Sequence, residues 1–460
     1  MKHYLAAALI AAAATGSATA SAANPRAGRA FVFSGADGSL LLTLIAPDVI
    51  ENGRFGEAVA GAGDVNGDMV PDLAVGASAV TDGGFKHAGR VYLFSGADGA
   101  LLRTIPAPAP AAGNRFGFSI AACGDVNADA RGDLVVGAPR VRVAGKGRVG
   151  SAYIISGADG STLATLSPPI PKKGAQFGIS VAAGTDVTGD MIADIAVGAP
   201  ADAVGGLRHV GRVSLFDVSG NFETSIPDPA PLTGARFGES VSFMNDATGD
   251  AVADLVIGAD AQDFAIGDFA GAVFLFSAPG GVPAFIKGVH SPTAEPFANF
   301  GFAVTGLSDL NGDGIGDFAG ASPDEDISSV SSVGRAFVLG GDPNTPTIAV
   351  LDDPAPHFAS FFGGSIAALP DLTADGFPEL GAGAELHQDP NGVRAGRAYV
   401  LEAKSGAIRF TIESPTGDVC ARFGWSVAPA GDVNGDLVPD LIVGAPFQRV
   451  TTRYATDNCF

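Results

Sequence analysis

The stretch FGEAVAGAGDVNGDMVPDLAVGA, which runs from Phe55 to Ala77, contains the pattern that decides the fold. It opens with a Phe-Gly pair, and an acidic loop begins nine residues after the Phe. The same pair and interval occur seven times, in copies 60 to 63 residues apart. The phenylalanines are Phe55, Phe116, Phe177, Phe237, Phe300, Phe362 and Phe423, and the loops begin at Asp64, Asp125, Asp186, Asp246, Asp309, Asp371 and Asp432. So regular a period indicates one supersecondary unit copied seven times.

Each copy has the pattern of four short strands. In the second copy an apolar segment begins at Phe116, and Leu134–Val136 follows the acidic loop as a short strand that Gly and Pro end. Two more strands are expected around Tyr153–Ile155 and over Ser161–Leu166. Four strands in a meander make one blade of a propeller, and about 60 residues are ample for it. We therefore predict an all-β fold, a seven-bladed β-propeller with four-stranded blades.

The two chain ends supply complementary parts of one blade. Residues 28–35 have the pattern of a third strand, and residues 440–446 have that of a second strand. We predict that N-terminal and C-terminal strands pair to close the seventh blade, since an open solenoid would need end caps and none is visible. The predicted propeller covers 28–460, with blades at about 54–104, 115–166, 176–226, 236–287, 299–350, 361–412, and 422–460 joined to 28–46.

Residues 1–22 have the features of a secretory signal peptide. Lys2 precedes an apolar run over 4–14, and small residues around Ala20 offer a cleavage site. The alternative is a membrane anchor, but this run is shorter than the roughly 20 residues that a span requires. We expect a secreted protein, extracellular or periplasmic, and no later segment of transmembrane length follows.

The net charge of −22 comes largely from the acidic loops. Loop positions 1, 5 and 9 account for 21 of the 49 acidic residues. Bound divalent cations would neutralise much of that charge, and an acidic surface repels phosphate backbones. The composition therefore excludes nucleic acid as an expected partner.

The acidic loops have the donor pattern of a calcium site. Positions 1, 3, 5 and 9 carry oxygen side chains, and position 7 can offer its backbone carbonyl. Hard oxygen donors in that number favour Ca²⁺ over Mg²⁺ or Zn²⁺, so we predict up to seven calcium ions. Asx turns alone would explain one or two such loops, but not seven in register. The predicted ligands are Asp64, Asn66, Asp68, Val70 and Asp72; Asp125, Asn127, Asp129, Arg131 and Asp133; Asp186, Thr188, Asp190, Ile192 and Asp194; Asp246, Thr248, Asp250, Val252 and Asp254; Asp309, Asn311, Asp313, Ile315 and Asp317; Asp371, Thr373, Asp375, Phe377 and Glu379; and Asp432, Asn434, Asp436, Val438 and Asp440.

Two further observations concern the type of calcium motif and its variation among the seven loops. An EF-hand is excluded because its twelfth position needs a bidentate Glu, whereas Val75 and Val136 stand there, inside expected strands. The loop 371–379 departs most from the others, because Thr373 replaces Asn and Glu379 replaces Asp. We expect it to be the weakest of the seven sites or a vacant one.

At these residues the chain resembles the FG-GAP repeats of integrin alpha-subunit N-terminal propellers and their bacterial secreted relatives. Phe55-Gly56 and Val75-Gly76-Ala77 match the elements that give the repeat its name, as do Phe116-Gly117 and Gly137-Ala138-Pro139. The resemblance implies a seven-bladed propeller, calcium in the hairpin loops, and ligand binding on the opposite face. Position 6 departs from the family pattern, since only Gly314 and Gly376 are glycines there.

The sequence offers little evidence of catalysis. No HExxH, GxSxG or P-loop pattern occurs, and the six histidines are scattered. The leading hypothesis is a secreted, non-catalytic binding or adhesion module for an extracellular protein or glycan. The alternative is an extracellular hydrolase or lyase acting on polysaccharide or phospholipid, with its site in the propeller channel or loops.

Two further clusters leave alternatives open. Basic residues gather at Arg140, Arg142, Lys146 and Arg148, with Lys172 and Lys173 one connection later, as either a solvated loop face or an anionic-glycan patch. Among the three cysteines, Cys123 is expected to be a buried free thiol. Cys420 and Cys459 are expected to form a disulfide beside the ring closure, unless Cys459 stays free or pairs with another molecule.

Overall fold

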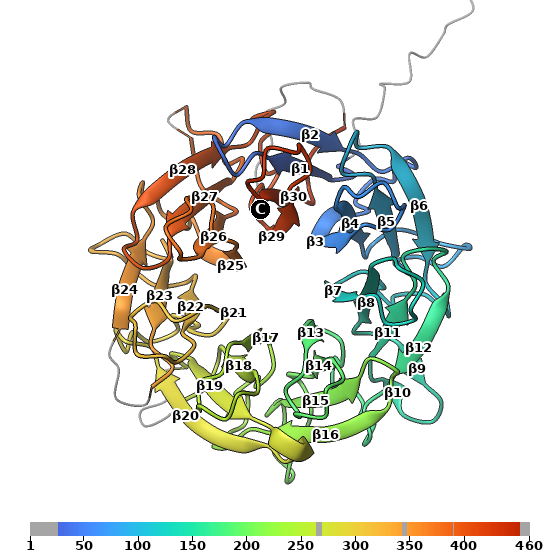
Figure 1. Cartoon of the computed structure of the whole chain (residues 1–460), viewed down its shortest axis with the longest axis vertical. Coiled ribbons are helices and arrows are strands. Elements are labelled where there is room, and N and C mark those ends of the chain that lie inside the picture. Colours follow the sequence, from blue (N-terminus) through green and yellow to red (C-terminus); the bar gives the residue numbers. More distant parts are fainter. Residues whose placement is uncertain (1–25, 264–268, 343–346, 390, 451–460) are drawn as a thin grey trace, which may run out of the picture.

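The computed structural model describes residues 26–263, 269–342, 347–389 and 391–450, and these form a closed ring of seven antiparallel sheets (Figure 1). The first blade contains β3 (Phe55–Gly63), β4 (Asp72–Ala77), β5 (Arg90–Phe94) and β6 (Leu101–Pro106); the second contains β7 (Ile120–Gly124), β8 (Asp133–Ala138), β11 (Ser151–Ile155) and β12 (Thr162–Leu166); the third contains β13 (Val181–Thr185), β14 (Asp194–Gly198), β15 (Arg212–Asp217) and β16 (Phe222–Pro227). The fourth contains β17 (Ser240–Met244), β18 (Asp254–Ala259), β19 (Ala272–Ser277) and β20 (Ala284–His290), with a 3-10 turn at Pro279–Gly281; the fifth contains β21 (Ala303–Gly306), β22 (Phe318–Ser322), β23 (Arg335–Leu339) and β24 (Thr347–Asp352); the sixth contains β25 (Phe362–Leu369), β26 (Glu379–Ala384), β27 (Arg397–Glu402) and β28 (Ile408–Glu413). A small hairpin of β9 (Arg142–Val143) and β10 (Gly147–Arg148) projects from the second blade.

The seventh blade combines the two chain ends. Its sheet has the order β2-β1-β30-β29, from β2 (Leu40–Leu44), β1 (Arg29–Phe33), β30 (Asp440–Ala445) and β29 (Ser426–Gly431). Strand β1 pairs antiparallel with β30 over five residues, from Arg29 opposite Ala445 to Phe33 opposite Leu441. The predicted seven-bladed propeller with a composite closing blade is confirmed.

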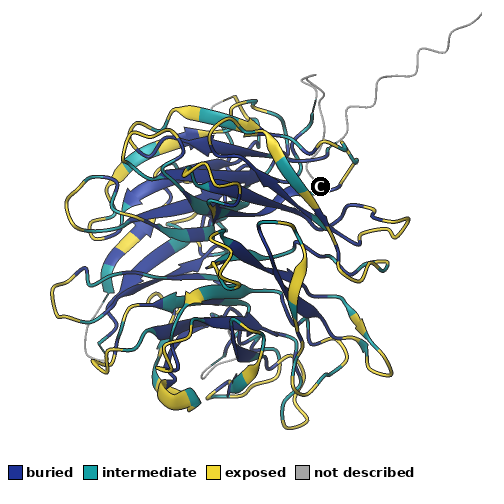
Figure 2. Cartoon of the chain, turned by 45° about the vertical axis from the view of Figure 1, so that its right-hand side comes forward, coloured by how far each residue is buried: buried dark blue, intermediate teal, exposed yellow. Residues whose placement is uncertain are grey.

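The core lies between the blades. The described residues contain seven clusters of buried apolar side chains, one at each junction between neighbouring sheets. The phenylalanine of every Phe-Gly pair is fully buried in one of them. Figure 2 shows the buried strands inside the ring and the exposed connections at its surface. Because each sheet packs only on its two neighbours, the repeat builds a large protein from small cores.

Glycine is required where successive blades touch. At six of the seven junctions the glycine before the third strand of one blade forms a parallel bridge to the phenylalanine of the next blade, as Gly150 does to Phe177. Gly150 has a φ of +100°, and a Cβ there would lie 2.1 Å from the Phe177 carbonyl oxygen. Only a residue without a side chain allows this approach. In five junctions a serine hydroxyl at or just before the first strand also donates to the carbonyl of the next Phe-Gly glycine. The bond from Ser426 to Gly56, at 3.0 Å, joins the seventh blade to the first.

Several predictions concern residues outside the described ranges. The expected signal peptide at 1–22 and Cys459 both lie there. Cys420 is disulfide-bonded, whereas Cys123 is free and buried as expected. The pairing of Cys420 with Cys459 stays a prediction. In the described part of the chain, no helix is long and apolar enough to cross a membrane.

Candidate metal loops and an axial pocket

The seven acidic loops join the first and second strands of the blades, so all lie on one face of the ring. One hydrogen-bond pattern recurs in each loop. The first-position carboxylate accepts the N–H of position 6 at 2.7–2.9 Å, and the fifth-position carboxylate accepts the N–H of position 7 at 2.8–2.9 Å. In the first loop these donors are Met69 and Val70. Seven copies with one geometry show that the spacing fixes the shape of the loop.

The ninth position is buried in every loop and binds the loop to its blade. Its carboxylate has at most 1% exposure and accepts the N–H of position 2 at 2.6–3.0 Å. In four blades its other oxygen accepts the N–H of a glycine in the outer turn, as Asp72 does from Gly96 at 3.1 Å. The residue therefore has a structural role whether or not it also ligates a cation.

Loops three and four lack that glycine donor. Within the described residues, Asp254 Oδ1 is buried without a hydrogen-bond partner. Asp194 instead shares a side-chain hydrogen bond with the Glu223 carboxyl, whose pKa burial and the Asp194 charge raise to about 8. In the fourth blade the Ser277 hydroxyl donates to Asp250 at 3.2 Å. Sequence analysis missed both residues, although the loss of the Ser-Gly-Ala-Asp-Gly turn in these two blades was a signal for them.

Carboxyl groups of the same loop have pKa values shifted in opposite directions. Burial acts to raise the pKa of Asp64, but the N–H groups of Gly67 and Met69 and the charge of Arg131 hold it below its usual value. At position 9, burial is the largest effect and raises the pKa in all seven loops, to about 6 for Asp254. The other acidic residues of the loop add to this rise, as Asp250 and Asp246 do for Asp254. Such crowding of negative charge is what a bound cation would relieve.

The donor chemistry of the loops fits Ca²⁺, but no closed ligand shell is formed. The donors are all oxygens, and among the described residues the buried Oδ1 atom of Asp254 has no hydrogen-bond partner. However, among the described residues no group of three or more His, Cys, Asp or Glu side chains lies close enough together to enclose a metal ion. The carboxylates turn to the N–H groups of their own loops instead. The calcium ligands named from the sequence stay a prediction.

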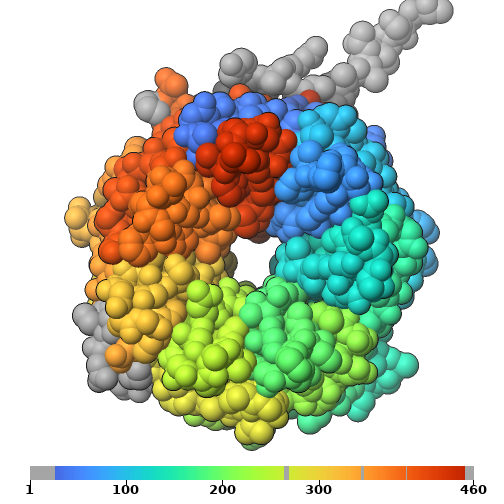
Figure 3. All heavy atoms as spheres, viewed as in Figure 1, coloured from blue at the N-terminus to red at the C-terminus, as the bar shows by residue number. Residues whose placement is uncertain are grey.

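On the opposite face, the blades converge on a pocket at the ring axis. The residues that follow the Phe-Gly pairs are Glu57, Phe118, Ile179, Glu239, Phe302, Gly364 and Trp425, and all seven line one cavity of about 310 Å³. Figure 3 shows the opening at the centre of the ring. Pro323, Asp324, Phe361 and Glu385 complete the lining. Sequence analysis did not predict this pocket, although its seven residues occupy one fixed position of the repeat.

The carboxylates of the axial pocket are largely paired with arginines. Arg54 Nη1 lies 2.7 Å from Glu57 Oε1, and Arg236 Nη2 lies 2.8 Å from Glu239 Oε1. Arg422 Nη1 lies 3.2 Å from Glu385 Oε1. The Oε2 atom of Glu239 is buried with no hydrogen-bond partner in the described structure, so the pocket keeps an unused acceptor.

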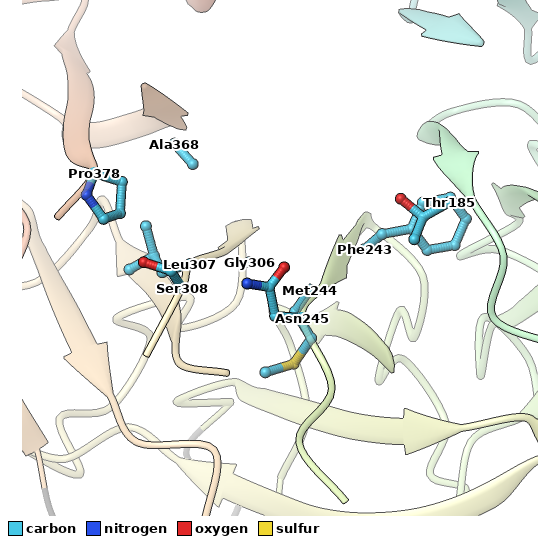
Figure 4. Close-up of a pocket in the computed structure, with 9 residues that line it drawn as sticks. All are labelled: Thr185, Phe243, Met244, Asn245, Gly306, Leu307, Ser308, Ala368 and Pro378. Carbon is cyan, nitrogen blue, oxygen red and sulfur yellow. The ribbon is translucent and has the colours of Figure 1, made fainter. Parts of the chain in front are cut away.

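A second cavity of about 260 Å³ opens near the acidic loops and is lined by residues of the third to sixth blades (Figure 4). It is lined by Thr185, Phe243, Met244, Asn245, Gly306, Leu307, Ser308, Ala368 and Pro378. None of these side chains is charged. The axial pocket, with its aromatic walls and carboxylates, is therefore the better candidate for ligand binding.

One cluster resembles a hydrolytic triad in composition but not in geometry. Ser360 Oγ donates to Asp353 at 2.7 Å, and His387 Nδ1 lies 3.5 Å from the same carboxylate. The aspartate stands between the serine and the histidine, so the histidine cannot take the serine proton. Ser360 and His387 are also buried. This cluster supports the fold and gives no hydrolytic site.

The repeat itself matches a known family model. Segments 55–94, 116–155, 177–216 and 423–456 match the FG-GAP repeat. The chain is an FG-GAP repeat protein. Its propeller is related to those of integrin alpha subunits, since it is 33% identical to Integrin alpha-5 of Xenopus laevis over 44% of this chain and 19% of the relative.

A second relative has the name of an enzyme. The FG-GAP protein is 33% identical to the phosphatidylinositol-glycan-specific phospholipase D of Homo sapiens, over 36% of this chain and 22% of the relative. The chain thus spans about a fifth of the length of these two relatives. Among solved structures, Sqt1 of Saccharomyces cerevisiae aligns over 82% of this chain and 78% of its own, with 10% identity and a TM-score of 0.45. We draw nothing from so low a structural score.

Proposed function

We propose that this FG-GAP protein is a secreted, calcium-loaded propeller that binds an extracellular protein or glycan without catalysis. The observation that carries the proposal is the axial pocket, to which all seven blades contribute one side chain at the same repeat position. Concave, mostly apolar sites with a few polar groups are the common form of ligand pocket. The acidic loops on the far face are then structural, with Ca²⁺ held by the oxygens of positions 1, 3, 5, 7 and 9.

The chemistry of the pocket favours a positively charged group. Aromatic ring faces attract cations, and Arg115 and Arg422 already lie over Phe118 and Trp425. Phe302 adds a further ring, and the Oε2 atom of Glu239 is a buried acceptor that has no hydrogen-bond partner in the described structure. Asp324 adds a carboxylate that accepts a hydrogen bond from the Asn299 amide. We therefore propose a lysine or arginine side chain of a protein partner as the occupant.

The test screens the calcium-loaded protein against a glycan array and a library of extracellular peptides. A variant with both Phe302→Gly and Trp425→Gly removes two pocket walls, and the sixth blade already carries Gly364 at this position. We expect basic peptides to bind the native protein and the variant to lose roughly tenfold or more in affinity. Val282→Gly, an exposed apolar change in an outer turn, is the control and leaves binding unchanged.

The alternative is an extracellular hydrolase or lyase acting on polysaccharide or phospholipid. The same preparations are assayed for turnover of both substrate classes. Turnover that a single pocket substitution abolishes would establish the enzyme and overturn the binding-only proposal.

A further inference from the structure

Arg115 differs from the other arginines at its repeat position. The residue before the Phe-Gly pair is Arg54, Arg115, Arg236 or Arg422 in four blades, each with φ between +54° and +61°. Three of these contact glutamates of the axial pocket. Arg115 instead lies 5.9 Å from the ring centre of Phe118, which stands where Glu57 and Glu239 stand in their blades. Among the described residues Arg115 forms no ion pair.

Two further arginines surround Arg115. The Arg140 N–H donates to the Asn114 carbonyl, which places Arg140 beside it. The Arg148 guanidinium lies next to Gly113, with Nη2 2.9 Å from where a Cβ would stand. Burial lowers the pKa of Arg115, and the charges of Arg140 and Arg148 add to that decrease against the pull of Glu57. Its Nε atom is buried and, within the described residues, has no hydrogen-bond partner. Glu57 thus acts on Arg115 from a distance, and no carboxylate of the described residues forms an ion pair with it.

The positive charge continues outward along the β9–β10 hairpin. Arg142 and Arg148 stand directly opposite each other on its two strands, an arrangement that like charges make unfavourable. Lys146 follows in the hairpin turn, and the Lys173 side chain passes Gly147, with Cγ 3.3 Å from the position of a Cβ. Residues 139–150 contain no acidic side chain. None of these cations forms an ion pair in the described part of the chain. We call Arg115, Arg140, Arg142, Lys146, Arg148 and Lys173 the basic track.

We propose that the basic track binds an acidic polysaccharide through its sulfate or carboxylate groups. The choice of a polysaccharide rests on the proposed extracellular role. Arginine forks bind such oxyanions bidentately. Six cations from three neighbouring connections suit a chain with a charge on successive sugars better than a single small ion. On a protein with a net charge of −22, so concentrated a positive region stands out as a specific surface.

The experiment measures binding of the full calcium-loaded protein to dextran sulfate, hyaluronan, polyglutamate and uncharged dextran. The test variant carries Arg115→Gln and Arg140→Ala, which are the residues that the third blade has at these positions, Gln176 and Ala201. The control is Arg208→Ser, because Arg208 is the exposed third-blade equivalent of Arg148. The variant Phe302→Gly/Trp425→Gly changes the axial pocket alone, so it shows whether polysaccharide binding depends on the basic track or on the pocket.

We expect binding to at least one acidic polysaccharide and none to dextran, with affinity that falls as salt rises. The double arginine variant loses roughly tenfold or more, while the control and the pocket variant keep native affinity. The proposal is overturned if neither acidic polysaccharide binds, if the double variant binds like the native protein, or if polyglutamate binds as tightly as the polysaccharide. If the native protein failed to bind basic peptides, the proposed role of the axial pocket would fail, and the result for the basic track would stand on its own.

Discussion

At the scale of single residues, two carboxylates of each acidic loop differ in what surrounds them. The first position is rich in N–H donors, and the ninth is buried at the base of the loop. Position 6 adds strain, since Met69, Met191 and Leu437 have φ near +70° there and are about 90% exposed. The energy that holds such a loop together must come from its hydrogen bonds and from any bound cation.

Glu385 in the axial pocket gives a pH-dependent stability that can be measured. Burial raises its pKa from 4.5 to about 7, although Arg422 opposes the rise. Between these values the folded protein keeps a proton that the unfolded chain releases, so Glu385 lowers stability as pH rises toward 7. The variant Glu385→Gln stays neutral. We expect its free energy of unfolding, relative to the native protein, to rise by roughly 1–3 kcal/mol from about pH 5 to about pH 8.

Urea unfolding at several pH values, with Ca²⁺ present, measures that difference. Glu51→Gln removes an exposed carboxylate and is the control for loss of charge alone. Parallel pH profiles for the native protein and Glu385→Gln would contradict the shifted pKa.

At the scale of elements, the sequence predicted the strands of each blade but not the contacts between successive blades. The period predicted the strands, and the Phe-Gly pairs marked the start of each copy of the repeat. The bridge from Gly150 to Phe177 joins residues of different blades, so no pattern within one repeat could reveal it. The axial pocket escaped prediction for the same reason, because its residues meet only when the ring closes. The calcium ligands were named from spacing, whereas Glu223 belongs to an outer strand and lay outside that spacing.

Substitution of Gly150 by alanine tests the junction between the second and third blades. The new Cβ would overlap the Phe177 carbonyl oxygen, so the two sheets must separate. We expect Gly150→Ala to lose about 3 kcal/mol or more in unfolding free energy. Gly145→Ala is the matched control, because Gly145 also has positive φ but has nothing within 4 Å of a Cβ. Its loss should be about 1 kcal/mol, from backbone strain alone. Equal losses in the two variants would show that the junction tolerates a side chain.

At the scale of the whole molecule, seven small cores depend on one closure. Each sheet packs on two neighbours, and the pairing of β1 with β30 completes the circle. The Gly35 N–H also donates to Asp440 at 3.0 Å, so the ninth position of the last loop contacts the N-terminal segment. Loss of order in the last acidic loop would therefore weaken the pairing of β1 with β30 as well.

Removal of calcium is the test at this scale. A ligand that binds only the folded state stabilises it by about 2.7 kcal/mol per site at 100 times its Kd, and several sites add. We expect a chelator to lower the melting temperature strongly, and added Ca²⁺, but not Mg²⁺, to restore it. A melting temperature that does not respond to the chelator would rule out calcium as part of the fold.

The composite blade also bears on how such a ring can change its size. The seam divides a blade between its second and third strands, so the repeating unit of the sequence and the blade of the structure are out of phase. Insertion or loss of one complete repeat at any internal point would add or remove one blade and leave the seam as it is. Gene duplication can therefore alter the number of blades while the two chain ends keep the same strand pairing.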